Sequence, residues 1–395
     1  MKRKAGRKPR PSFSTLEYNL NYYKIDMKRK GLRMISLFLM RGSQFLLIML
    51  IGSTAFSKPP ILNKKEMRTH PPRVTRTCCA FGSNLKIAVI PFAHMNTAIE
   101  FSELGRHQYL GGNKEGNGIL YTTKGGFIDL GHLREWADWT AFLYLYIQDT
   151  SITINYLKSL GVEGGKKSLI LRDTDSLSTD DRLLLAGRIA FELSHWHEIA
   201  TGYGVSAAPF ISEKFSSFSP EDMYSNMLGI NLAIKAIKSN LSYDDALTNL
   251  LNRKLVELDV VDSIEATYEA LDQVENIWWS KEYSVPNKKI MLKRSYLESA
   301  CIKPWLVPNA SNPTSYAELD VPVCSNDGTE FCQFFTLNIK VNHKIPIKKA
   351  LPNHHGKTIS QSDFDLLIQY VRVDLTKIEV KAAMKSRSKR GKVKA

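Results

Sequence analysis

Apolar residues recur at steps of three and four through the middle of the chain, a spacing that predicts helices. The first predicted helix covers about 130–148 with Asp129 as its N-cap, and its apolar face carries His132, Trp136, Trp139, Leu143 and Tyr146. The second runs from Ser178 to Thr201, and its apolar face carries Ala186, Ile189, Ala190, Leu193, Trp196 and Ala200. A third opens at Ser219-Pro220-Glu221-Asp222, where proline and acidic residues suit a first turn.

Strands are predicted nearer the two ends of the chain. Segments 85–90 and 119–123 are strand-like runs, and segments 335–341 and 371–375 alternate in polarity. The sequence therefore predicts an α+β fold with a helical central region, small strands near the N-terminal part and a strand-rich C-terminal part. We expect a main α+β domain over 77–310 and a strand-rich extension over 311–380.

The first 57 residues have the pattern of an export signal. Basic residues within 28–33 precede the apolar run 45–51, and Ala55-Phe56-Ser57 offers a cleavage site with small residues at both ends. An uncleaved N-terminal anchor is the alternative. Either way, the expected location of the body is periplasmic, envelope-associated or extracellular. Residues 58–76 are rich in Pro, Lys and Arg and are expected to form a linker.

The formal net charge of +15 comes from the two ends of the chain. Residues 1–57 hold twelve Lys and Arg against two acids, and residues 381–395 hold seven Lys and Arg with no acid, which leaves 58–380 nearly neutral. Nucleic-acid binding would therefore depend on the two basic ends alone, and we expect none. The basic tail 381–395 is expected to be disordered, and its charge could contact anionic lipid or an envelope polymer.

Helical phase separates the two histidines of the second predicted helix. His197 falls within the apolar face, so we expect it to be buried, whereas His195 and Glu192 fall on the side expected to face solvent. Glu198 lies nearer the polar side than the core. His132 leads the apolar face of the first helix, so two helices each direct one imidazole toward apolar surroundings.

A buried imidazole needs a hydrogen-bond partner or a metal ion, because an unmet polar group is costly to bury. Each histidine could be a core residue satisfied by its neighbours. Alternatively, His132 and His197 converge, either as ligands of a divalent metal such as zinc or as a proton-transfer pair, with Glu198, Glu135 or Asp138 as carboxylate partner. In a metal site, Asp222 or Asp138 would be a further ligand or an orienting group. Asn226 follows Asp222 by one helical turn and shares its face.

The stretch His197-Glu198 begins like the metalloprotease motif H-E-x-x-H, but Thr201 stands where its second histidine belongs. A metal-dependent hydrolase would use Glu198 as general base. Cysteine chemistry is an alternative, with Cys78 or Cys79 as nucleophile, a histidine as base, and Asp129 or Asp138 orienting that base. A non-catalytic envelope scaffold or binding protein is the third possibility. Elsewhere, a turn between Cys324 and Cys332 could be closed by a disulfide.

Several segments together resemble an uncharacterised bacterial family known only as a domain of unknown function (4056). The resemblance rests on 78–82, on 127–140, on Trp196-His197-Glu198-Ile199-Ala200-Thr201 and on 218–229, and it spans roughly 77–310. It implies a secreted or envelope-associated bacterial protein and brings no established activity.

Overall fold

The computed structural model describes one compact unit within residues 59–395. The described residues are 71–72, 76, 80–88, 90, 92–148, 158–206, 212–296, 301–308 and 316–377. The predicted leader, the adjacent Cys78 and Cys79, and the basic tail lie outside these residues. No helix of the described ranges is long and apolar enough to cross a membrane.

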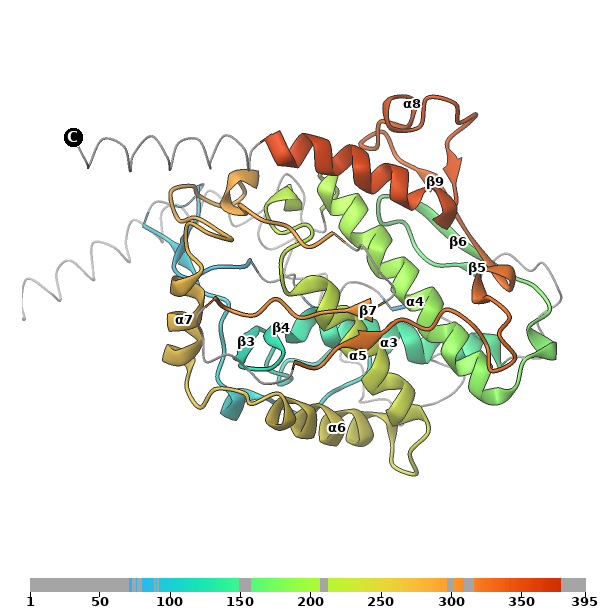
Figure 1. Ribbon diagram of the computed structural model, residues 1–395, viewed down its shortest axis with the longest axis horizontal. Helices are drawn as coiled ribbons and strands as arrows, with labels where there is room; N and C mark the ends of the chain where they lie inside the picture. Colours follow the sequence, from blue (N-terminus) through green and yellow to red (C-terminus); the bar gives the residue numbers. More distant parts are fainter. Residues whose placement is uncertain are drawn as a thin grey trace, which may run out of the picture. The chain divides into compact units, whose positions relative to one another are not determined.

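Helices occupy the centre of the described chain and short strands lie toward both ends, which confirms the predicted α+β class (Figure 1). The helices are α3 (Leu130–Ile147), α4 (Thr179–Gly202), α5 (Asp222–Ile237), α6 (Tyr243–Glu257), α7 (Ile264–Gln273), α8 (Ile347–Ala350) and a helix over 364–377. The strands are β1 (Leu85–Lys86), β2 (His94–Met95), β3 (Ile119–Thr122), β4 (Gly126–Asp129), β5 (Lys158–Ser159), β6 (Gly165–Leu171), β7 (Cys301–Ile302), β8 (Leu319–Asp320), β9 (Phe335–Val341) and β10 (Thr358–Ile359).

Helix α3 packs against both α4 and α5, and a glycine allows the second contact. A Cβ atom built on Gly229 of α5 would lie 1.9 Å from the main-chain oxygen of Leu133 on α3, closer than any side chain permits. The two helices therefore approach backbone to backbone. This close approach brings the first turn of α5 beside the first turn of α3.

The start of α3 is fixed by its capping residue. Strand β4 runs directly into the helix, and the Asp129 carboxylate accepts hydrogen bonds from the backbone N–H groups of Gly131 and His132. The cap predicted from the sequence is confirmed. Helix α5 begins at Asp222, two residues after the proline predicted as its first helical residue, because Ser219 and Pro220 belong to the preceding turn.

The C-terminal segment completes a four-stranded antiparallel sheet of order β10-β9-β6-β5. Strand β9, predicted at 335–341, pairs with β6 over seven residues. The strand predicted at 371–375 is wrong, because these residues lie within the helix over 364–377. Val371 and Leu375 are buried at a four-residue step whereas Val373 between them is exposed, so tertiary burial follows a helical period.

Helix α4 is covered on more than one side. Trp196 stacks on Phe364 of the C-terminal helix, and the opposite flank packs on α3 and α5. The expectation that His195 and Glu192 face solvent is therefore wrong: they are 5% and 8% exposed. Glu198, expected nearer the polar side of the helix than the core, is also buried, at 1% exposed.

No disulfide joins Cys324 and Cys332, which are free, exposed thiols. The disulfide loop suggested between Cys324 and Cys332 is therefore wrong. The turn between them is instead held by hydrogen bonds, since Ser325 Oγ donates to Asp327 and the Ser325 N–H donates to the carbonyl of Thr329.

Candidate metal centre

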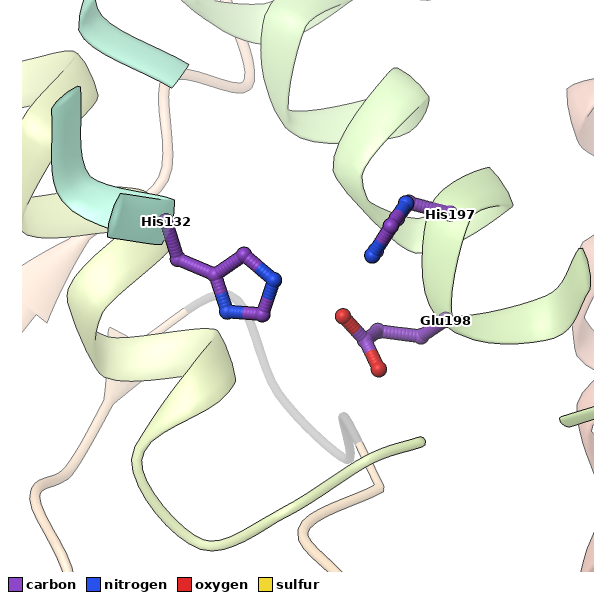
Figure 2. A group of neighbouring side chains, drawn as sticks. All are labelled: His132, His197 and Glu198. Atoms are coloured by element: carbon purple, nitrogen blue, oxygen red, sulfur yellow. The ribbon is translucent and has the colours of Figure 1, made fainter. Parts of the chain in front are cut away.

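Two imidazoles and one carboxylate, contributed by two helices, meet in the interior (Figure 2). His132 comes from the first turn of α3, and His197 and Glu198 come from the C-terminal part of α4. One candidate ligand atom from each lies within 4.8 Å of the other two. The imidazole ring centroids are 5.4 Å apart and nearly perpendicular, and all three side chains are buried. The spacing is compatible with a single ion between them.

Each of these histidines has its Nδ1 atom against a carboxylate. His132 Nδ1 lies 2.8 Å from Asp222 Oδ1, and His197 Nδ1 lies 2.5 Å from Glu163 Oε1. A carboxylate that accepts the Nδ1 proton fixes the tautomer in which Nε2 carries the lone pair. This arrangement is the usual outer shell of metal-binding histidines. Figure 2 shows a ring nitrogen of both residues directed toward the Glu198 carboxylate.

Glu163 is a site residue that sequence reasoning missed. It precedes β6, and its second oxygen, Oε2, accepts a hydrogen bond from Lys167 Nζ at 3.0 Å. Burial raises the pKa of the Glu163 carboxyl, but the nearby Lys167 and His197 outweigh it and hold that pKa well below its usual range. Glu163 is therefore a fixed anion behind His197. Glu163 and Lys167 lie in a turn and a strand, where their four-residue spacing is no signal of an ion pair, and nothing in the sequence pointed from Glu163 to His197.

Glu198 has one oxygen occupied and one directed at the histidines. Its Oε2 accepts the backbone N–H of Phe218 at 2.6 Å, while Oε1 is buried without a hydrogen-bond partner among the described residues. Burial raises the pKa of the Glu198 carboxyl, the charge of Asp222 raises it further, and the two histidines oppose the change only in part. A cation at this point would stabilise the ionised form of Glu198.

A second group of potential ligands shares His132. Asp129, His132 and Asp222 also place one ligand atom each within 4.8 Å of one another. The two aspartates already have structural partners, since Asp129 caps α3 and Asp222 Oδ2 accepts the N–H of Ser219 at 2.8 Å. With His132 Nδ1 at hydrogen-bonding distance from Asp222, this group is better suited to orienting His132 than to binding a separate ion.

Three buried carboxyl groups near the centre have no lysine or arginine partner among the described residues. In the part of the chain that the structure describes, no Lys or Arg forms an ion pair with Glu198, Glu221 or Asp222. Burial and the adjacent charges of Asp222 and Asp129 raise the pKa of the Glu221 carboxyl well above its usual value. Buried carboxylates in such a group favour a bound cation or a shared proton.

The remaining candidates fall in different places. Asn226 is fully buried one turn beyond Asp222, and neither of its amide atoms has a partner within the described ranges. Asp138 is not brought to the histidine pair. Its carboxylate lies 2.9 Å from Arg76 Nη1 and 3.0 Å from His107 Nε2 in a separate buried network. Cys78 and Cys79 lie outside the described residues.

Thr201, four residues after His197, forms hydrogen bonds within its own helix. Thr201 Oγ1 donates hydrogen bonds to the backbone carbonyls of His197 and Glu198, within the helix. The second histidine near His197 and Glu198 comes from α3 and not from the same helix, so a motif search along one helix does not find it.

Fold and site together define a mixed α+β protein with a buried cluster of two histidines and a carboxylate. The family described as Protein of unknown function (DUF4056) matches residues 66–308, which is more than half of the chain. The chain belongs to this family, as the resemblance of its motifs indicated. No curated protein and no solved structure matches the chain.

Proposed function

We propose that this protein is a metal-dependent hydrolase whose divalent ion is held by His132, His197 and Glu198. The carrying observation is that both imidazoles have a carboxylate on Nδ1 while they converge on Glu198. Two histidines and one glutamate are a ligand set that zinc takes in hydrolytic sites, where a fourth position stays open for water or substrate. A bound zinc ion would polarise a carbonyl group and lower the pKa of its water toward neutrality.

Within this proposal Glu198 is a ligand, although the H-E-x-x-H comparison made it the general base. Its Oε1 atom faces the two histidines, and Oε2 is held by the N–H of Phe218. Asp222 and Glu163 orient the imidazoles and stabilise the positive charge that they share with the ion. Of the two roles expected for Asp222, further ligand or orienting group, the proposal uses the second.

Zinc titration of the purified full chain by calorimetry tests the proposal. We expect one ion per chain, and replacement of His132 or His197 by Asn should weaken zinc binding by about 100-fold or more, since one of three ligands is lost. His195→Asn is the matched control, because His195 is equally buried on α4 but is not among the residues whose ligand atoms converge. Absence of zinc binding, or equal binding by all variants, would contradict the proposal.

A non-catalytic scaffold is the second candidate, and one observation favours it. The contact of His132 Nδ1 with Asp222 can hold α3 against α5, and the hydrogen bond of His197 with Glu163 can hold α4 against the segment before β6, both without an ion. In that case a chelator should leave the melting temperature unchanged, whereas a bound ion should add stability that chelation removes.

We propose further that the protein is exported, on the strength of the sequence pattern over 28–57. Expression of the full chain in a bacterial host, followed by mass measurement of the product in the periplasmic fraction, tests this. Loss of the residues before Lys58 is expected. An intact chain confined to the cytoplasm would contradict the proposal.

A further inference from the structure

Two lysines face each other on the outer side of the four-stranded sheet. Strands β6 and β9 pair with Lys166 directly opposite Lys340, so both side chains leave the same face of the sheet. Both lysines are exposed, whereas their neighbours along each strand are buried. Like charges directly opposite each other destabilise an antiparallel pair. In the described ranges no acidic group forms an ion pair with either lysine, so no described contact offsets this repulsion.

The segment between β9 and β10 adds lysines at the end of this sheet. Residues 342–357 hold four lysines and three histidines, and no acidic residue occurs from 336 to 362. The Lys357 carbonyl accepts the N–H of Val341 at 2.9 Å, one residue from Lys340, so the segment returns beside the lysine pair. Figure 1 shows α8, which lies within the segment, at the edge of the molecule next to β9.

Five exposed lysines make up this basic face, and none of them forms an ion pair with a described residue. Lys344 is not counted, because its Nζ atom donates to the Gly204 carbonyl at 2.9 Å. A surface of one sign without counter-charges attracts an anionic partner, and the attraction is strongest at low salt. The five are Lys166, Lys340, Lys348, Lys349 and Lys357.

An apolar side chain projects beside the basic face. Val162 lies in the turn between β5 and β6, four residues before Lys166, and is 79% exposed. The turn is joined to the start of the lysine-rich segment, because the Asn342 N–H donates to the Gly164 carbonyl at 3.0 Å. A valine gains free energy only where an apolar phase covers it. Lysines and an exposed apolar side chain are the two components by which proteins bind a lipid interface.

The residue types of the basic face favour a bilayer over a nucleic acid. From 336 to 362 there is no arginine, the residue best suited to bidentate phosphate contacts, and no aromatic residue to stack on a base. Lysine supplies a hydrated point charge, and several lysines spread over a surface match the negative potential of an anionic leaflet. An apolar side chain among them contributes to binding at a bilayer but not on a phosphate backbone.

We propose that the basic face binds the surface of a lipid bilayer that contains anionic headgroups, with Val162 entering the boundary between headgroups and acyl chains. The lysines supply the attraction, and the valine supplies the apolar contact. A headgroup phosphate between Lys166 and Lys340 removes the repulsion that this pair bears in the free protein. The proposal does not depend on the candidate metal centre or on the ion proposed for it.

Co-sedimentation with vesicles tests the basic face in the full chain, whose two basic ends are the same in every variant. The vesicles hold phosphatidylcholine with about one third phosphatidylglycerol, and replacing three lysines of the face by Gln should weaken binding by about tenfold or more. The three are Lys166, Lys340 and Lys348. The matched control replaces three exposed lysines outside the face, and it should bind as the natural chain does: Lys86, Lys114 and Lys235. Equal binding by the two triple variants overturns the proposal.

Stability provides a second readout that a purely structural pair would move in the opposite direction. Replacing Lys166 and Lys340 together by Gln removes the repulsion between them, so this variant should unfold at a higher urea concentration than the natural chain while binding vesicles more weakly. A lower urea midpoint would show that the two lysines support the fold, and would overturn the proposal.

Val162→Ser distinguishes a bilayer from a soluble polyanion. We expect vesicle binding to fall by about threefold or more, because the apolar contact is lost, while binding to polyphosphate stays as in the natural chain. Val256→Ser on α6 is the matched control, since Val256 is 59% exposed and lies outside the face. Unchanged vesicle binding by Val162→Ser, or binding of the natural chain to polyphosphate or duplex DNA but not to vesicles, rules out a bilayer as the partner of this face.

Discussion

His197 Nδ1 lies 2.5 Å from Glu163 Oε1, across 34 positions of sequence. The contact joins the C-terminal part of α4 to the segment before β6, whose partner strand β9 comes from the C-terminal part of the chain. Lys167, at the start of β6, holds the other Glu163 oxygen. The orientation of His197 is therefore set by the sheet and not by the helix that carries it.

Replacing Glu163 by Gln should weaken zinc binding by about 10- to 100-fold, because loss of an outer-shell carboxylate lowers ligand basicity and loosens the imidazole. Calorimetric titration with zinc measures the change. Lys167→Met should have a smaller effect of the same sign, since Glu163 keeps its contact with His197. Equal affinity in the natural chain and Glu163→Gln would show that this carboxylate does not support a ligand.

Two substitutions of Asp222 test, in the same zinc titration, how much this residue contributes to zinc affinity. Asp222→Asn removes the charge but keeps an acceptor for His132 Nδ1, whereas Asp222→Ala removes both. We expect zinc affinity to decrease in the order natural chain, Asn, Ala. If Asp222→Ala binds zinc as tightly as the natural chain, Asp222 only stabilises the turn at Ser219 and does not support His132.

Gly229→Ala should destabilise the fold and disturb the centre together. The added Cβ would meet the main-chain oxygen of Leu133 at 1.9 Å, so α3 and α5 must separate, at a cost of about 1–3 kcal/mol. Gly187→Ala on α4 is the matched control, because its Cβ would meet only side-chain atoms, at 3.0 Å or more. Urea unfolding compares the two, and equal stability would refute the close contact.

Glu115 should make stability depend on acid pH. Burial raises the pKa of its carboxyl, but the hydrogen bond and charge of Arg76, with smaller contributions from His107 and Arg134, lower that pKa to about 2. Because the pKa of Glu115 is lower in the folded than in the unfolded chain, its ionised carboxylate stabilises the native state at pH values above the unfolded-state pKa. This stability, about 3 kcal/mol, should be lost as pH falls from about 4.5 to about 2.

Urea unfolding of the natural chain and Glu115→Gln over this pH range measures the effect. Glu115→Gln should be the less stable protein at neutral pH, because Arg76 loses a charged partner while remaining buried. The difference between the two should shrink toward pH 2. A constant difference across the range would mean that Glu115 titrates alike in both states.

The sequence by itself determined the helices and one face of each. Helical periodicity located α3 and α4, the Asp129 cap was readable from residue type, and phase identified His197 as buried, because local repeats and capping chemistry depend only on neighbours along the chain. The same reasoning assigned His195 to solvent although it is 5% exposed, since the periodicity of one helix does not show which other segments cover its second face.

Tertiary structure alone decided the composition of the centre. It placed His132 beside His197, Glu163 against His197, Asp222 against His132, and Asp138 in a separate network with Arg76. These contacts depend on the close approach of α3 and α5 at Gly229 and on the pairing of β6 with β9. Both bring together residues far apart in sequence, and helical or strand periodicity carries no information about which distant side chains meet.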